Sequence, residues 1–150
     1  TTLARELSLK YSIDYYELDK VVWDDDNGNV KRTLEERNKL FKKIINKKNW
    51  IIEDVGRESF KEGIKKANYV FYIKSNRFII YYRCIKRWLK QVFKLEKYNY
   101  KPTIKSLFQM LGWARNDCFN KKKKIDYIKS NTQNLIIITI KDIKRGIILK

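Results

Sequence analysis

The feature that most constrains the fold is an alternation of short, strand-like apolar segments with longer segments of helical periodicity. The strand-like segments are residues 15–19, 50–56, 69–73 and 135–140, which are rich in aromatic and β-branched residues. Between them, apolar residues recur at the three- and four-residue spacing of a helix. Strands that alternate with helices pack as a mainly parallel sheet with helices on both faces, so the sequence predicts an α/β fold.

Several helices can be placed from their end signals and their apolar stripes. Thr33 and Glu36 have the spacing of a capping box, and Thr103 is expected to start a second helix. Further helices are expected at residues 3–10, 59–66, 76–94 and 143–149. The buried face of the helix after Thr33 is predicted to hold Leu34, Phe41, Ile44 and Ile45. That of residues 76–94 is predicted to hold Phe78, Tyr82, Ile85, Leu89 and Val92.

Length and composition favour one folded domain over residues 1–150. The chain has 150 residues, of which 43% are hydrophobic, and this suffices for a sizeable core. No apolar run approaches the length of a membrane span, so we expect a cytoplasmic protein with no membrane partner. Cys84 and Cys118 lie in helical patterns and are expected to be buried thiols. The chain has no histidine, which excludes histidine-based catalysis and histidine zinc sites.

The positive charge is concentrated in the second half of the chain. The formal net charge is +18, and residues 74–124 carry 15 Lys and Arg against two acids. Such a surface faces an anion, which can be a nucleotide phosphate, a nucleic acid or an anionic membrane. A basic amphipathic helix on a membrane is the least favoured of the three.

Candidate site residues gather where the predicted strands end. In parallel sheets, ligands bind beyond the carboxyl ends of the strands. Asp19 and the pair Glu53 and Asp54 fall at two such ends, and residues 75–77 fall at a third. The acidic run at residues 24–26, beside Asn27 and Gly28, lacks the full spacing of a Ca²⁺ loop and is interpreted as a solvated turn.

The first residues are similar to the second half of a phosphate-binding loop. A Walker A motif ends in Gly-Lys-Ser/Thr at the start of a helix, and Thr1 would be its Ser/Thr position. The order of parts along the chain resembles the adenylate-kinase-like group of P-loop kinases, and within it the bacterial branch described as DNA topology modulation (FlaR-type) proteins. The residues that carry this resemblance are 1–5, Leu18, Asp19, Trp23, 50–54, 67–73, Arg77, Arg83 and Arg87.

This resemblance implies a three-layer P-loop NTPase fold with parallel strand order 2-3-1-4-5 and a helical lid region at about residues 88–124. Its central first strand and Gly-rich loop would precede Thr1, so we expect an N-terminal segment to be missing from this sequence. The chain departs from the family pattern in two places. The family often has an acidic residue and then glycine soon after the tryptophan of its third strand, which corresponds to residues 50–56 here, but this chain reaches glycine only at Gly56. The lid has Lys and Tyr where Arg is usual.

The resemblance also implies that the protein binds ATP and Mg²⁺ and transfers a phosphoryl group. Thr1 would bind Mg²⁺ beside Thr2, and Glu53 or Asp54 would hold the metal through water or orient the acceptor. Asp19 would orient an acceptor. Trp23 could stack on a substrate ring, although a large aromatic residue is more often part of the core and that position is favoured here. Arginine guanidinium groups form bidentate hydrogen bonds with phosphate oxygens, and they are always charged. Arg77, Arg83 and Arg87 are therefore candidate cations that would stabilise the transition state. Arg115 is a further candidate if its helix folds over the site.

An alternative function uses the basic segment directly. Residues 74–124 interleave cations with aromatic residues, which is typical of a surface that binds nucleic acid through phosphate contacts and stacking. The aromatic residues in question are Tyr81, Tyr82, Trp88, Phe93, Tyr98 and Tyr100. The sequence leaves open which of these functions holds, which small molecule or nucleotide is the acceptor, and what the oligomeric state is.

Overall fold

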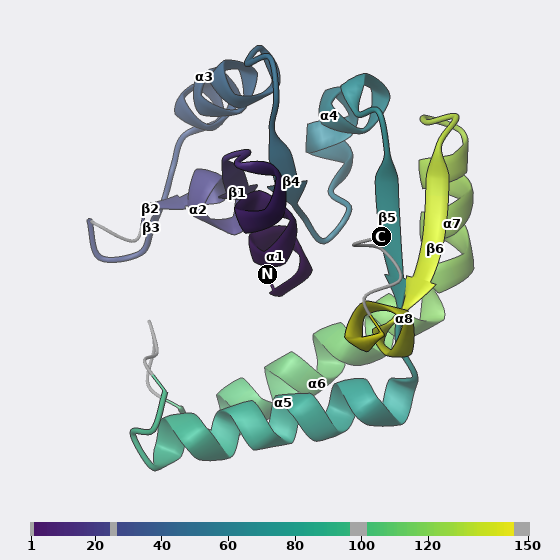
Figure 1. Cartoon of the computed structure of the whole chain (residues 1–150). Coiled ribbons are helices and arrows are strands. Elements are labelled where there is room, and N and C mark those ends of the chain that lie inside the picture. The colour runs from purple at the N-terminus through teal and green to yellow at the C-terminus, as the bar shows by residue number, and fades with distance from the viewer. Residues whose placement is uncertain (1, 25–26, 97–101, 146–150) are drawn as a thin grey trace.

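The computed structural model describes residues 2–24, 27–96 and 102–145 (Figure 1). The first half contains α1 (Thr2–Tyr11), β1 (Tyr15–Glu17), α2 (Leu18–Val22), β2 (Trp23–Asp24), β3 (Val30–Lys31), α3 (Leu34–Ile45), β4 (Ile51–Glu53), the 3-10 turn η1 (Glu58–Phe60) and α4 (Lys61–Lys66). The second half contains β5 (Val70–Lys74), α5 (Arg77–Val92), α6 (Ile104–Phe119), α7 (Lys121–Lys129), β6 (Leu135–Thr139) and α8 (Ile140–Lys144). The mixed α/β class predicted from the sequence is confirmed.

The strands form three separate two-stranded sheets. β1 pairs in parallel with β4, so that Glu17 lies opposite Glu53, and β5 pairs in parallel with β6. β2 and β3 form a short antiparallel hairpin. Figure 1 shows β4 and β5 as the facing strands of the two parallel pairs, and no hydrogen-bonded pairing joins them. The parallel arrangement was predicted, whereas the division into two pairs follows only from the structure.

The main hydrophobic core lies in the first half of the chain. Phe41 and Phe60 stack in its centre with ring centroids 4.6 Å apart, and α4 approaches so closely that a Cβ on Gly63 would lie 3.0 Å from the Phe41 ring. Burial of each such side chain is worth about 1.5–3 kcal/mol. The buried members of this cluster are Leu18, Val21, Val22, Phe41, Ile44, Ile45 and Phe60. The predicted burial of Phe41, Ile44 and Ile45 is therefore confirmed.

α5 and α6 form an antiparallel helical hairpin that extends from the lower end of β5 in Figure 1. Asn76 caps α5 by accepting a hydrogen bond from Phe78 N at 2.9 Å, and Thr103 and Ser106 form a capping box on α6. The indole Nε1 of Trp88 donates to the Thr103 carbonyl oxygen at 3.0 Å, which ties the two helices together. The predicted helix start at Thr103 is confirmed.

The predicted core stripe of α5 is wrong. Phe78 and Tyr82 are 65% and 63% exposed, and Ile85, Leu89 and Val92 are also exposed. The less exposed side of α5 instead carries Cys84, Trp88 and Gln91, and Trp88 contacts the residue that caps α6. The apolar stripe was identified correctly, but no other described part of the chain covers it.

Other expectations need smaller corrections. Asp19 was expected at a strand end, but β1 stops at Glu17 and Asp19 lies in the first turn of α2. Leu34 was expected in the core and is 67% exposed, because it is the first residue of α3 and lies beyond the core. Trp23 begins the β2–β3 hairpin, which the sequence did not predict. Cys84 and Cys118 are half-buried free thiols rather than fully buried ones.

The end of the chain also differs from the prediction. The lysine run at residues 121–124 begins a helix that was not predicted, α7, and the closing helix, expected at residues 143–149, starts at Ile140. Tyr98 and Tyr100 lie outside the described residues. Within residues 2–24, 27–96 and 102–145, no helix is both long enough and apolar enough to cross a bilayer.

Candidate functional site

The structure brings two predicted site residues together at the carboxyl ends of β1 and β4. Asp19 follows β1 in the first turn of α2, and Asp54 is the first residue after β4. Arg57 lies between them and forms an ion pair with each: Nη1 with Asp54 Oδ1 at 2.5 Å, and Nη2 with Asp19 Oδ1. We call Asp19, Asp54 and Arg57 the Asp–Arg–Asp cluster.

Asp54 has both carboxylate oxygens engaged by its own loop. Oδ2 accepts hydrogen bonds from Gly56 N at 2.7 Å and from Arg57 N at 2.6 Å, while Oδ1 is paired with the Arg57 guanidinium. This turn uses a left-handed conformation at Gly56 (φ +82°), which a residue with a side chain adopts only with strain. Asp54 therefore shapes the loop between β4 and η1.

Arg57 is the member of this cluster that the sequence did not predict. Burial disfavours its charged form, but the hydrogen bond to Asp19 and the charges of Asp54 and Asp19 outweigh this, so the pKa of the guanidinium is raised above its ordinary value. Its contact with Asp19 spans 38 positions in sequence, which no local pattern reveals. One local signal was available. Asp54 lies two residues before Gly56 and three before Arg57, and this spacing is typical of an Asx turn.

Glu53 and Glu17 place two further carboxylates at the same edge. They lie opposite each other in the parallel register, and Oε2 of Glu53 has no solvent exposure. Glu17 is held by Lys20 Nζ at 3.6 Å and by the Tyr15 hydroxyl at 3.4 Å. The edge therefore combines several carboxylates with one cation that is always charged.

Helix α7 closes the loop of the cluster from the other side. The aliphatic stem of Lys124 packs on Gly56, at 3.4 Å from the position of an added Cβ, and its Nζ pairs with Asp117. The buried hydroxyl of Tyr127 has no hydrogen-bond partner among the described residues. Burial and the nearby charges of Glu58 and Asp54 raise the pKa of Tyr127, so this hydroxyl stays protonated.

The predicted arginines lie on the α5–α6 hairpin, in a different part of the molecule from the cluster. Arg87 Nε pairs with Glu96 Oε1 at 3.3 Å, and Arg83 is exposed. Arg77 lies over the ring of Phe78 and Arg115 over that of Phe119, at 4.9 and 5.5 Å from the ring centres. Among the described residues, no hydrogen bond or ion pair joins these arginines to the Asp–Arg–Asp cluster.

The predicted metal ligands are not assembled into a group. Thr1 lies outside the described residues, and Thr2 is the exposed first residue of α1. The described part of the chain contains no group of three or more acidic or cysteine side chains arranged to hold a metal ion. The roles of Thr1, Thr2, Glu53 and Asp54 toward Mg²⁺ and ATP stay predictions.

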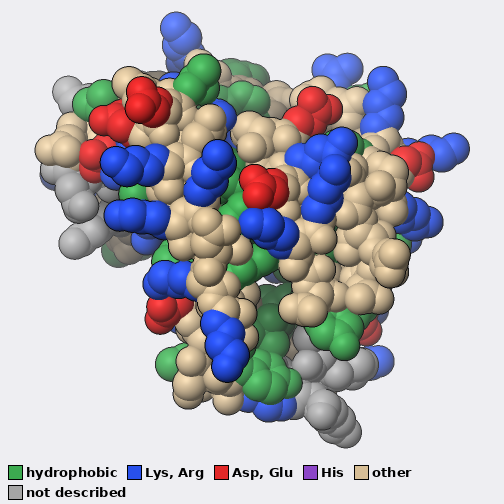
Figure 2. Space-filling view, turned by 90° about the horizontal axis from the view of Figure 1, so that it is seen from above, with side chains coloured by type: hydrophobic (Ala, Val, Ile, Leu, Met, Phe, Trp, Pro, Cys, Tyr) green, Lys and Arg blue, Asp and Glu red, His purple; other side chains and the backbone are tan. Residues whose placement is uncertain are grey.

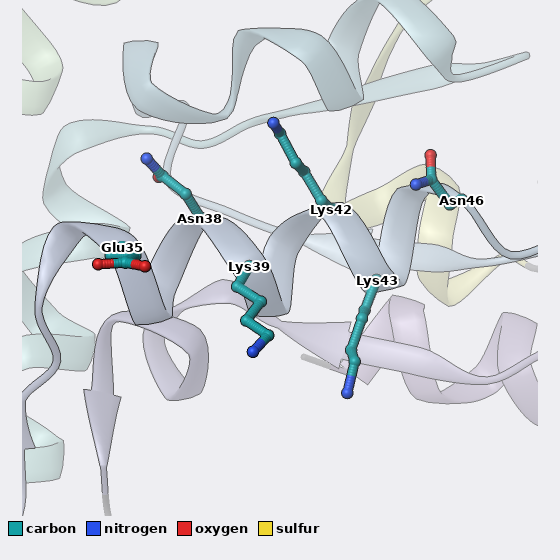
Figure 3. A pocket seen from close by; sticks show the side chains of 6 residues that line it. All are labelled: Glu35, Asn38, Lys39, Lys42, Lys43 and Asn46. Carbon is teal, nitrogen blue, oxygen red and sulfur yellow. The ribbon is translucent and has the colours of Figure 1, made fainter.

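A surface hollow along α3 does not coincide with any predicted site. Figure 3 shows its lining side chains projecting from successive turns of the one helix, with Lys42 and Lys43 pointing in opposite directions. The lining residues are Glu35, Asn38, Lys39, Lys42, Lys43 and Asn46. Side chains that diverge from a single exposed helix do not form a binding cavity.

Positive charge also extends over faces far from the hairpin. Figure 2 shows the molecule from above, with Lys and Arg side chains spread across this face and acidic side chains among them. The positive surface is therefore not confined to residues 74–124, and charge alone does not locate a binding site.

Comparisons of this sequence with known protein families, with characterised proteins and with solved structures gave no match in any of the three.

Proposed function

We propose that this chain is a P-loop kinase-like domain that uses ATP and Mg²⁺ to phosphorylate a small molecule or nucleotide. The observation that carries the proposal is the arrangement of the two parallel strand pairs, with β4 and β5 facing each other but unpaired. Parallel sheets are normally continuous and covered on both faces. In β5 and β6, however, Ile73, Ile136 and Ile137 are about two-fifths exposed.

In this proposal one further parallel strand lies between β4 and β5. It would be the first strand of the family order 2-3-1-4-5, in which β1, β4, β5 and β6 are strands 2, 3, 4 and 5. Such a strand would end at the same edge as β1 and β4, beside the Asp–Arg–Asp cluster. A Gly-rich loop after it would present backbone N–H groups to the phosphates of ATP and lead into α1 at Thr1 and Thr2. The geometry of the edge, rather than of any one residue, supports this site.

In this proposal the described residues would supply the remaining parts of a phosphoryl-transfer site. An acceptor oxygen attacks the γ-phosphorus, the bond to the ADP oxygen breaks, and the acceptor proton leaves through a carboxylate such as Asp19. Glu53 and Asp54 stand on the strand end that would face a hydrated Mg²⁺. Arg77, Arg83, Arg87 and Arg115 are carried by the α5–α6 hairpin, the lid of this proposal, which would bring one or more of them to the phosphate.

The first test is equilibrium binding of ATP with Mg²⁺ to two proteins. One is the 150-residue chain, and the other is the same chain with an N-terminal apolar strand followed by Gly-x-x-x-x-Gly-Lys directly before Thr1. We expect the extended protein to bind ATP at least about 100-fold more tightly, because only it has a phosphate cradle. Equal affinity of the two proteins would overturn the proposed strand position.

The second test examines the proposed catalytic arginine in the extended protein. Arg87→Ala should lower phosphoryl transfer, including ATP hydrolysis without acceptor, by roughly 10³- to 10⁵-fold. The matched control is Lys90→Ala, which removes an exposed cation from the next turn of α5 and should change turnover by less than about threefold. Equal losses in both variants would assign the effect to general charge and remove Arg87 from the mechanism.

A further inference from the structure

α5 carries a continuous apolar stripe that faces solvent. Its members recur every three or four residues and therefore share one side of the helix. On its less exposed side, α5 has Cys84, Trp88 and Gln91, and at about 100° per residue the stripe lies about a third of a turn further on. The stripe consists of Phe78, Tyr82, Ile85, Leu89 and Val92, with Phe93 directly after the helix.

α6 carries a second exposed stripe in a matching position. Ile104, Phe108, Arg115 and Phe119 share one side, and all four are exposed. The buried side of α6 has Met110 and Ala114, and the stripe lies between a third and a half of a turn further on, at about 100° per residue. Two antiparallel helices that pack on each other are related by a two-fold axis across the pair, so rotations in the same sense and of similar size place both stripes on the same side of the hairpin. We call this side the hairpin face.

Aromatic rings are the most prominent part of the hairpin face. Phe78, Tyr82, Phe93, Phe108 and Phe119 are 63–76% exposed, whereas Ile85, Leu89 and Val92 are 41–42% exposed. The three aliphatic side chains of α5 are therefore less exposed than the rings, while Ile104 at the start of α6 is as exposed as they are. A partner that lies on this face meets ring surfaces first.

Cations accompany these rings. Arg77 lies over Phe78, Lys86 over Tyr82 at 5.8 Å, and Arg115 over Phe119. α5 has five basic residues and no acidic residue, and Lys94 follows just after its end. Self-association through this face would bring these cations together, so charge disfavours a second copy of the chain and favours a polyanion.

We propose that the hairpin face binds single-stranded nucleic acid, with bases stacked on its exposed rings and phosphates on its cations. A single strand offers both an unpaired base face for each ring and a regular row of phosphates, which a duplex or an acidic peptide does not. This inference shares Arg77 and Arg115 with the proposed lid, but it does not require phosphotransferase activity. It uses neither the Asp–Arg–Asp cluster nor the strand proposed between β4 and β5.

The experiment measures binding of the 150-residue chain to a fluorescent oligo-dT of about 20 nucleotides by anisotropy. A duplex of equal length and vesicles of phosphatidylglycerol are measured in parallel. We expect the single strand to bind more tightly than the duplex, and its affinity to fall steeply between about 50 and about 200 mM salt.

The chain offers a matched pair of rings for the decisive variants. Phe108 and Trp113 are both in α6 and both 67% exposed, but five residues at about 100° each put Trp113 on another side of the helix. Phe108→Ala should weaken binding by roughly 5- to 100-fold, and Trp113→Ala by less than about twofold. Arg115→Gln should reduce the salt slope by about 0.7, the contribution of one phosphate contact to a single strand.

The outcomes distinguish base stacking from general charge attraction and from membrane binding. Equal effects of Phe108→Ala and Trp113→Ala, or equal affinity for single strand and duplex, would overturn the proposal in favour of general charge attraction. Binding to the vesicles without binding to oligo-dT would overturn it in favour of a membrane surface. Circular dichroism of each variant checks that the helices are intact, and both rings are exposed, so their removal leaves the fold in place.

Discussion

The first half of the chain and the α5–α6 hairpin use the same kind of amphipathic helix with opposite results. In the first half, α2 and α3 turn their apolar sides toward each other and toward β1 and β4, and the rings of Phe41 and Phe60 are almost fully buried. In the hairpin, α5 has an equally regular stripe, yet Phe78 and Tyr82 remain mostly exposed. The difference lies in what stands opposite each stripe, not in the stripe itself.

This contrast separates two uses of an apolar side chain. In the core, a ring loses its contact with water and gains close-packed neighbours, and both contribute to the free energy of unfolding. On the hairpin face, a ring contributes little to stability and stays available to a partner. Apolar periodicity alone therefore identifies a face but not its use.

The largest expected effect tests this separation with the same substitution in both regions. Phe41→Ala should lower the free energy of unfolding by about 3–5 kcal/mol, because it leaves a cavity against Phe60 and Gly63. Phe108→Ala should change it by less than about 0.5 kcal/mol, because that ring is on the surface. Urea unfolding followed by circular dichroism measures both values.

A loss above about 2 kcal/mol for Phe108→Ala would show that the ring is packed in solution, within the range of core truncations. The hairpin face would then be buried against another part of the protein or a second molecule. The contrast between the two regions would fail, and with it the binding proposal for the face.

Local signals in the sequence predicted elements better than they predicted contacts. Thr33 with Glu36 and the lone Thr103 marked two helix starts correctly, because a capping box is made within four residues. The β2–β3 hairpin was missed because its strands have only two residues each and are too short for any period to show. Burial of the α5 stripe was predicted wrongly because it depends on elements distant in sequence.

The candidate site shows the same limit. Asp19 and Asp54 were selected from strand ends, and the structure does bring them to one edge. The residue that joins them, Arg57, could not be found from strand periodicity, because its bond to Asp19 connects the loop after β4 to helix α2. The separation of β4 from β5 was also invisible in the sequence, since strand pairing is set by tertiary packing.

The second prediction compares a half-buried ion pair in the cluster with an exposed one in the hairpin. Asp54→Ala removes an acceptor from two backbone N–H groups and leaves Arg57 with one partner, so we expect a loss of about 1–3 kcal/mol in unfolding free energy. Glu96→Gln breaks only the exposed pair with Arg87 and should cost well under about 1 kcal/mol. Thermal unfolding of the two variants measures the difference.

The ranking of these variants can also be checked by salt. Added salt should reduce the small effect of Glu96→Gln toward zero, because solvent ions screen exposed charges. It should leave most of the Asp54→Ala loss, which comes from backbone hydrogen bonds within the loop. An Asp54→Ala loss that vanishes in salt would mean that the loop does not depend on these hydrogen bonds.

The smallest expected effect compares the capping boxes of α3 and α6, which differ in one chemical respect. At α3, Thr33 N donates to Glu36 Oε2 at 3.0 Å, whereas at α6 the partner of Thr103 N is the hydroxyl of Ser106, also at 3.0 Å. The side-chain hydrogen bond of Thr33, followed by its backbone hydrogen bond, lowers the pKa of Glu36 below its ordinary value of 4.5. Only the α3 cap therefore depends on a group that titrates.

Because the pKa of Glu36 is lower in the folded state, its carboxylate stabilises the fold when the pH is above the unfolded-state pKa of 4.5. This stabilisation is lost as the pH falls through the lower folded-state pKa. Thr33→Ala should therefore reduce the melting temperature most near neutral pH, and its deficit against wild type should shrink below about pH 4.5. The deficit of Thr103→Ala should stay constant over the same range, because Ser106 does not titrate there. Melting curves of wild type and both variants from about pH 3 to about pH 7 decide the matter. If the melting-temperature deficit of Thr103→Ala also changed with pH, titrating groups other than Glu36 in the α3 cap would be responsible for the pH dependence.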